Sequence, residues 1–199
     1  MWDQRYSESG FAYGIAANDF LKDQFQQIPS GGRVLCLAVG EGRNAVFLAE
    51  QGYQVTAVDL SEVGLNKALK LASDKGVHIL TQVVDLADYS LGEQQWDGII
   101  SISAHMPEAI RQRVHAQLEP ALQRGGVFIL EAYTYQQTKM EGTGGPPASQ
   151  KEMFMSLDNL RIELAALYEV TAIEKQRTIS EGKFHQGLSA VVQFVGYKR

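Results

Sequence analysis

A glycine turn, and an acidic residue that ends the next apolar run, are the features of this sequence best suited to hold a cofactor. The apolar run 34–38 leads into Gly40-x-Gly42, and a second run, 55–58, stops at Asp59. Glycines let the backbone approach a ligand closely, and a carboxylate at this spacing accepts hydrogen bonds from ribose hydroxyls. The pattern therefore predicts a site for a cofactor that contains ribose.

Two classes of cofactor fit these residues. Gly40-x-Gly42-x-x-Ala45 followed by Asp59 matches the dinucleotide fingerprint, which is typical of an NAD(P)-dependent oxidoreductase. A further acid, Asp85, follows a third apolar run, where an adenine amino group can donate to it. Two acids at consecutive strand ends read ribose and adenine without a pyrophosphate site, as S-adenosylmethionine binding requires. A module that binds a cofactor or a partner without catalysis is the third hypothesis.

Short apolar runs and helical patterns alternate over the first two thirds of the chain. Strands are expected where apolar runs are bounded by turn residues, and helices where apolar residues recur at helical spacing. The predicted strands are 33–38, 54–58, 78–84, 96–101 and 127–132. The predicted helices are 18–27, 43–51, 62–75 and 107–122, and Ser61 is the expected N-cap of the third. This alternation predicts an α/β fold, with a doubly wound, mostly parallel sheet and helices on both faces.

The last third of the chain breaks the alternation. A loop rich in glycine, proline, lysine and methionine, residues 133–155, is typical of a lid over a binding site. After a predicted helix, 157–167, the β-rich runs 168–179 and 184–197 flank a hairpin signal at 180–183.

The chain length favours a single domain, 1–199, with a sizeable core. The first 14 residues carry four aromatic side chains, so we expect residues 1–28 to form a helix preceded by a segment that covers the cofactor.

The ordered motifs resemble those of class I S-adenosylmethionine-dependent methyltransferases, and in particular the small tellurite-resistance and thiopurine-methyltransferase-like group. The motifs are Trp2-Asp-x-Arg-Tyr6, Gly40-x-Gly42-Arg-Asn44, Val58-Asp59-Leu-Ser61, Asp85-Leu86, Trp96-Asp97-Gly-Ile-Ile and Gly125-Gly126-Val-Phe-Ile-Leu-Glu131. The resemblance implies a seven-stranded sheet whose last strand is antiparallel. The sequence departs from the group at Cys36 and Ala38, where an acid and a glycine are usual.

The resemblance also implies S-adenosyl-L-methionine as the cofactor and a set of residues that bind it. Carried onto this sequence, the set is Tyr6, Tyr13, Val39, Gly40, Gly42, Asn44, Asp59, Leu60, Asp85, Leu86 and Ser101.

Two histidines are the candidate catalytic residues. His105 follows the fourth predicted strand, where substrate pockets open in this architecture, and His185 lies in the terminal hairpin. A soft anionic acceptor (the thiolate of a thiol, a selenide, or a selenium or tellurium oxyanion) needs no general base, whereas an oxygen or nitrogen acceptor uses one of these histidines. No spacing of metal ligands is present, so no metal is expected.

The net charge, the length of the apolar runs and the cysteine content limit the partners and the location that we expect for this protein. The net charge of −5 argues against nucleic acid, and no apolar run approaches the roughly 20 residues that cross a bilayer. With one cysteine and a polar start, the chain is expected to be cytoplasmic. We expect a monomer or homodimer that acts on a small-molecule substrate.

Overall fold

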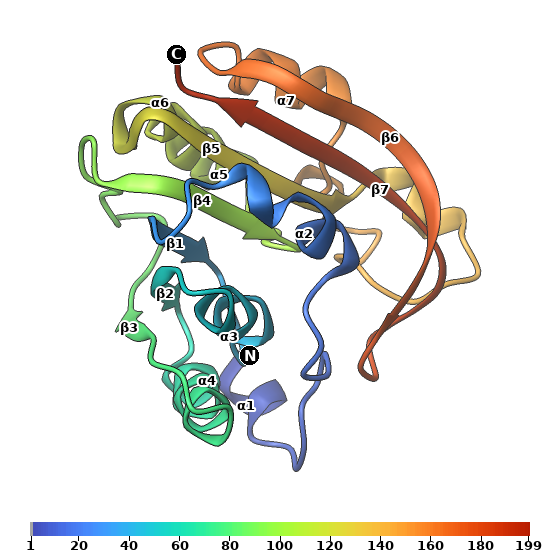
Figure 1. Ribbon diagram of the computed structural model, residues 1–199. Coiled ribbons are helices and arrows are strands. Elements are labelled where there is room, and N and C mark those ends of the chain that lie inside the picture. The colour runs from blue at the N-terminus through green and yellow to red at the C-terminus, as the bar shows by residue number, and fades with distance from the viewer. Residues whose placement is uncertain (1) are drawn as a thin grey trace.

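The computed structural model describes residues 2–199 and is organised around one seven-stranded sheet (Figure 1). Along the sheet the strands follow the order β3-β2-β1-β4-β5-β7-β6. All pairs are parallel except those of β7, which runs antiparallel to both β5 and β6. The strands are β1 (Arg33–Leu37), β2 (Gln54–Asp59), β3 (Leu80–Val83), β4 (Trp96–Ile102), β5 (Leu122–Tyr133), β6 (Tyr168–Glu181) and β7 (His185–Tyr197). The predicted fold class is confirmed, including the antiparallel last strand.

Helices cover both faces of the sheet because alternate residues of the central strands point to opposite sides. Val34 and Cys36 of β1 pack under α2, α3 and α4, whereas Leu35 and Leu37 pack under α5, α6 and α7 (Figure 1). The helices are α1 (Trp2–Tyr6), α2 (Asp19–Gln24), α3 (Arg43–Glu50), α4 (Glu62–Asp74), α5 (Glu108–Ala116), α6 (Leu118–Ala121) and α7 (Leu157–Glu163). Three short 3-10 helices complete the list: η1 (Phe25–Gln27), η2 (Tyr135–Lys139) and η3 (Lys151–Met153).

The helix predicted over 107–122 is wrong in its extent. Pro107 precedes α5 as its N-cap, and α5 ends at Ala116. Pro120 has no N–H to donate to the carbonyl of Ala116 and its ring crowds that carbonyl, so one continuous helix cannot form. The chain instead makes the short α6 and enters β5 at Leu122, five residues before the predicted start of the strand.

The N-terminal part of the chain crosses the ends of the strands before it reaches α2. Helix α1 packs against α4, and residues 11–17 then run past the turn between β6 and β7 (Figure 1). In this turn the backbone N–H of Lys183 donates to the carbonyl of Ala12. Within residues 2–199, no helix combines the length and the apolar composition that a membrane span needs.

Candidate functional site

The site lies at the carboxyl ends of β1 and β4, where the order of the strands reverses. From β1 the chain continues outward to β2 and β3, and from β4 it continues in the opposite direction to β5. Open α/β sheets bind ligands in the crevice that this reversal creates. Two non-glycine residues directly beyond these strands, Ala38 and Ser103, have left-handed backbones, with φ of 48° and 55°. Each such residue costs roughly 1–2 kcal/mol, and residues of this kind cluster at ligand sites.

Asp59 ends β2 with its carboxylate turned to the glycine turn. Its Oδ2 accepts the N–H of Gly40 at 2.7 Å, and its Oδ1 accepts the N–H of Ser61 at 2.8 Å. Burial raises the pKa of Asp59, and these backbone donors oppose the rise. Each oxygen keeps a further lone pair for a ribose hydroxyl. Beside it, Leu60 is 57% exposed and offers an apolar surface that a flat base can cover.

The acid predicted to bind adenine lies beyond β3. Asp85 is exposed, and only its Oδ1 is used, by the N–H of Ala87 at 2.8 Å. Leu86 is half-buried and packs against the core, and Ser101 is buried in the last part of β4. Val39, which is half-buried, donates its N–H to the carbonyl of Val58.

The two glycines of the turn each leave room for a different neighbouring side chain. A Cβ on Gly42 would collide with the Cβ of Ala68, so this glycine lets α3 and α4 approach each other. A Cβ on Gly40 would lie 2.6 Å from the hydroxyl of Tyr6, which is buried at the turn. Burial, and secondarily the nearby Asp59, raise the pKa of the Tyr6 hydroxyl, so it stays protonated. The tyrosine predicted to contact the cofactor thus lies beside both the glycine turn and the acid.

Side chains that follow the turn hold the N-terminal segment, residues 11–18. Glu41 Oε2 accepts the N–H of Ala12 at 2.7 Å, and Asn44 Oδ1 accepts the N–H of Asn18 at 2.9 Å. Arg43 also donates to a carbonyl of this segment, at residue 16. Asn44, which was predicted to bind the cofactor, therefore uses its side-chain oxygen to fix the segment that covers the site.

Five rings, which we call the aromatic row, connect the glycine turn to the loop after β5. In order they are Tyr6, Tyr13, His185, Tyr133 and His105, with centroids of successive rings 6.5, 4.5, 5.2 and 5.7 Å apart. The aromatic row places both predicted histidines and both predicted tyrosines in one continuous series of ring contacts. It begins at the expected cofactor site and ends under η3.

The two histidines of the aromatic row differ in whether their ring nitrogens already have hydrogen-bond partners. His105 Nδ1 bonds the carbonyl of Met153 at 2.9 Å, and its Nε2 accepts the N–H of Tyr133 at 3.2 Å. Burial lowers the pKa of His105 to about 4. Both nitrogens are therefore occupied by backbone. In contrast, the nearest partner of His185 Nδ1 is Glu181 Oε2 at 3.7 Å, which is too long for a hydrogen bond. Burial also lowers the pKa of His185, and Glu181 opposes that shift.

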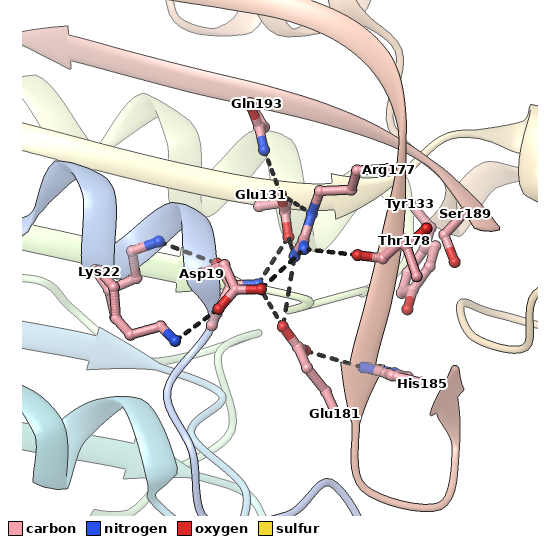
Figure 2. A network of polar contacts seen from close by, with 12 residues as sticks. Asp19, Lys22, Glu131, Tyr133, Arg177, Thr178, Glu181, His185, Ser189 and Gln193 are labelled. Atoms are coloured by element: carbon pink, nitrogen blue, oxygen red, sulfur yellow. Dashed lines mark hydrogen bonds and ion pairs between the residues drawn. The ribbon is translucent and has the colours of Figure 1, made fainter. Parts of the chain in front are cut away.

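A buried network of charged side chains holds the turn end of the terminal hairpin (Figure 2). Arg177 donates to both oxygens of Glu131, at 2.9 and 2.6 Å, and lies 3.4 Å from Glu181. Glu181 also pairs with Arg43 at 2.5 Å, and Asn18 donates to both glutamates. Although burial alone would raise the pKa of Glu181, His185 and Arg43 lower it to about 2. The network links the start of α3 to the hairpin that carries His185.

Sequence reasoning assigned no role to the residues of this network. The only local signal is the presence of charged residues within apolar strands, such as Glu131 at the end of 127–130. Such residues are almost never fully buried unless they are paired. That rule indicates that a partner exists, but it does not identify Arg177, which lies 46 positions away.

The described residues fit S-adenosylmethionine. Asp59 and Asp85 keep free lone pairs for ribose hydroxyls and an adenine amino group, and Leu60 offers an apolar surface between them. Tyr6 of α1 and Tyr13 of the N-terminal segment would cover the remainder of the cofactor.

Comparisons with known proteins agree with this geometry. Residues 34–126 match a family model described as a methyltransferase domain. YqeM of Bacillus subtilis, named as a methyltransferase, is 36% identical over 74 residues, which is 37% of this chain and 29% of YqeM. The matched segments span less than half of the curated relatives, 29% in YqeM and 44% in a second B. subtilis methyltransferase, YbaJ.

Solved structures share the fold. TehB from Haemophilus influenzae superposes with a TM-score of 0.73 at 16% identity, covering 100% of this chain and 66% of that chain. A structure described for the conversion of a disulfide bond into a thioacetal group during echinomycin biosynthesis superposes with a TM-score of 0.74 at 18% identity. The match covers 99% of this chain and 90% of that chain. Other neighbours are S-adenosylmethionine-dependent methyltransferases from several organisms.

Residues 34–126 are thus similar to a methyltransferase domain, solved structures of S-adenosylmethionine-dependent methyltransferases share the fold, and the residues of the candidate site fit S-adenosyl-L-methionine. The nicotinamide alternative finds no comparable support among these matches.

Proposed function

We propose that this protein transfers a methyl group from S-adenosyl-L-methionine to a small-molecule acceptor with a soft nucleophilic atom. The observation that carries the proposal is the carboxylate of Asp59, fixed by two backbone N–H groups opposite the glycine turn. The cofactor supplies a methyl group on a positively charged sulfur, which is already activated for displacement. The chain therefore contributes positioning and the exclusion of water more than acid–base chemistry.

The covering elements supply that exclusion. The N-terminal segment lies over the glycine turn, and the loop after β5 meets the hairpin where the backbones of Thr143 and Gln186 bond each other. The side chains of Glu41 and Asn44 hold the backbone of the N-terminal segment, whereas backbone groups alone join the loop after β5 to the hairpin. A small acceptor suits a site enclosed in this way.

Isothermal titration of S-adenosylhomocysteine into the wild type and Asp59→Asn tests the cofactor assignment. A hydrogen bond to a charged group contributes about 1.5–3 kcal/mol, so we expect Asp59→Asn to bind about 10- to 150-fold more weakly. Asp97→Asn is the matched control, because Asp97 also accepts a backbone N–H, that of Arg33, but at the amino ends of β1 and β4, away from the candidate site. The control should bind like the wild type.

Equal affinity of Asp59→Asn and the wild type would contradict the assignment, as would binding of NADH in place of S-adenosylhomocysteine. A urea midpoint for each variant separates loss of the ligand contact from loss of the fold. A screen of small acceptors with labelled S-adenosylmethionine then tests the transfer itself.

A further inference from the structure

A cavity of about 380 Å³ lies where the start of α5, η3 and α7 meet. Cavities of this size are in the range that holds small molecules. The residues that line it are Glu108, Arg111, Lys151, Glu152, Phe154 and Asn159. None of the residues predicted to bind the cofactor or to act in catalysis is among them, so the cavity is distinct from the candidate site described above.

Arg111 is the buried charge at this cavity, and its side chain is 1% exposed. Its Nε and Nη2 donate to the carboxylate of Glu163 at 3.1 and 2.8 Å, and its Nη1 donates to the carbonyl of Glu152 at 2.9 Å. A guanidinium has five N–H groups, so Nη1 and Nη2 each keep one N–H without an acceptor among residues 2–199.

These remaining N–H groups lie at the wall of the cavity. The carbonyl that Nη1 meets belongs to Glu152, and Oε1 of Glu108 lies 3.7 Å from Nη2, which is too long for a hydrogen bond. Both glutamates line the cavity. Because buried donors in native proteins nearly always have a partner, the N–H groups of Arg111 indicate a ligand that brings an acceptor.

The charges around the cavity limit the kind of ligand. Two cations, Arg111 and Lys151, line it together with two acids, Glu108 and Glu152, and Glu163 already neutralises Arg111. A simple anion would meet two carboxylates, whereas a simple cation would leave the N–H groups of Arg111 unpaired. A ligand that carries both charges satisfies both sets of groups.

We propose that this cavity binds a free α-amino acid with an apolar side chain, whose carboxylate accepts the remaining N–H groups of Arg111 and whose ammonium group donates to Glu108. Both charged groups of an α-amino acid are bonded to one carbon, so their partners must be neighbours. Nη2 of Arg111 and Oε1 of Glu108 meet that condition at 3.7 Å. The ring of Phe154 offers an apolar wall to the side chain of the ligand. This binding goes beyond the proposed methyl transfer and does not depend on it.

The cofactor carries an amino-acid group of its own, but that group is expected elsewhere. The aromatic row begins at Tyr6, beside the glycine turn, and ends at His105. Phe154 lies beyond His105, with ring centroids 6.2 Å apart. The cavity is therefore at the opposite end of the aromatic row from the glycine turn, and the amino acid and the cofactor can be bound together.

Helix η3 connects the cavity to the aromatic row. The carbonyl of Glu152 accepts an N–H of Arg111, and the carbonyl of the next residue, Met153, bonds Nδ1 of His105. An amino acid held by Arg111 and Glu108 would therefore fix η3 and the end of the loop after β5.

Isothermal titration of L-leucine tests the assignment, and it is run with and without saturating S-adenosylhomocysteine. Two fragments of leucine are the matched probes: isocaproate lacks the ammonium group, and isoamylamine lacks the carboxylate. We expect leucine to bind with the same affinity in both conditions. Each fragment should bind at least about tenfold more weakly than leucine, because each loses a hydrogen bond between charged groups.

Glu108→Gln removes the proposed acceptor of the ammonium group and leaves the pair between Arg111 and Glu163 intact. Since Glu108 is half-exposed, we expect leucine to bind this variant about two- to fivefold more weakly. Isocaproate, which no longer meets the charge of residue 108, should bind the variant more tightly than the wild type. Glu62→Gln is the control, because Glu62 also lies in the first turn of a helix, α4, and it should change neither affinity.

Arg111→Lys keeps a cation for Glu163 but cannot present several N–H groups in one plane. This variant should bind leucine about tenfold more weakly, as loss of a charged hydrogen bond predicts. Arg113→Lys is the control on the same helix, because the N–H groups of Arg113 meet backbone carbonyls at residues 86 and 89. A urea midpoint for each variant separates loss of the ligand contact from loss of the fold.

Amide hydrogen exchange locates the ligand without any substitution. Leucine should slow exchange at residues 153–155, which follow the bond between Glu152 and Arg111, and leave residues 40–42 of the glycine turn unchanged. Slower exchange at the glycine turn, or displacement of leucine by S-adenosylhomocysteine, would place leucine in the cofactor site and overturn the assignment. So would the absence of leucine binding, or equal binding of leucine and either fragment. Failure of S-adenosylhomocysteine to bind would overturn only the proposed function.

Discussion

Replacement of Arg177 by methionine is expected to destabilise the protein by about 3 kcal/mol, since it leaves two buried carboxylates without the cation between them. Arg177 bonds both oxygens of Glu131 and lies 3.4 Å from Glu181. Removal of one partner from a buried ion pair costs about 3–5 kcal/mol. The lower end applies, because the Arg177 side chain keeps 13% exposure and Asn18 and Gln193 still donate to Glu131.

Urea denaturation at equilibrium measures this loss, and the chain offers a closely matched control. Arg161 also forms a two-point pair, with Glu169, through Nε and Nη2 at 3.0 Å each. That pair is half-exposed, so water screens it, and Arg161→Met should leave the midpoint unchanged. If both variants lowered the midpoint equally, burial would not be the source of the strength of the network.

A double-mutant cycle sharpens the test. Glu131→Gln alone leaves Arg177 facing a neutral amide, whereas the double variant Arg177→Met/Glu131→Gln removes both charges together. The double variant should be more stable than the sum of the single changes predicts, by about 1–3 kcal/mol. Strict additivity would show that the two side chains do not interact in solution.

Two further predictions concern the strained turn and the acid limit of stability. Ala38→Gly should raise the free energy of unfolding by up to about 1 kcal/mol, because relief of the left-handed backbone outweighs the added chain entropy of glycine; a lower urea midpoint would contradict this. Despite burial, His115 and Arg111 hold the pKa of Glu163 below its ordinary value of 4.5. The stability that this pairing contributes is complete above about pH 4.5 and is lost as the pH falls through the lower folded pKa. Glu163→Gln should therefore flatten the acid side of a curve of urea midpoint against pH, and an unchanged curve would refute the pairing.

The sequence predicted the features that depend on local pattern. The carboxyl ends of β1 to β5, the glycine turn and the acid at Asp59 follow from apolar runs and turn residues within a few positions of each other. The N-cap predicted at Ser61 also depends on local pattern, and the structure confirms it, because the Ser61 hydroxyl accepts a hydrogen bond from the N–H of Gly64. Such features are recognisable because short-range sterics and hydrogen bonding determine them.

Features that depend on distant pairing were not predictable. The position of His105 after β4 indicated a site residue, but the carbonyl that occupies its Nδ1 belongs to Met153, in a loop 48 positions away. Asn44 carried the expected motif, yet its oxygen meets the backbone of Asn18 because the N-terminal segment crosses at that point. The register between β5 and β7, which are far apart in the sequence, decides which charges meet, and it is not set by a connecting turn as the register between β6 and β7 is.

The link between Asn18 and the terminal hairpin has a consequence for how the molecule folds. Asn18 is bonded to Glu131 and Glu181, which lie 113 and 163 positions further along the chain. Contacts of such separation carry a large entropy of loop closure and form late. During synthesis residues 11–18 leave the ribosome long before β6 exists, so they have no anchor on the hairpin until the last strands pair. Their amides should be among the last to gain protection from hydrogen exchange during refolding.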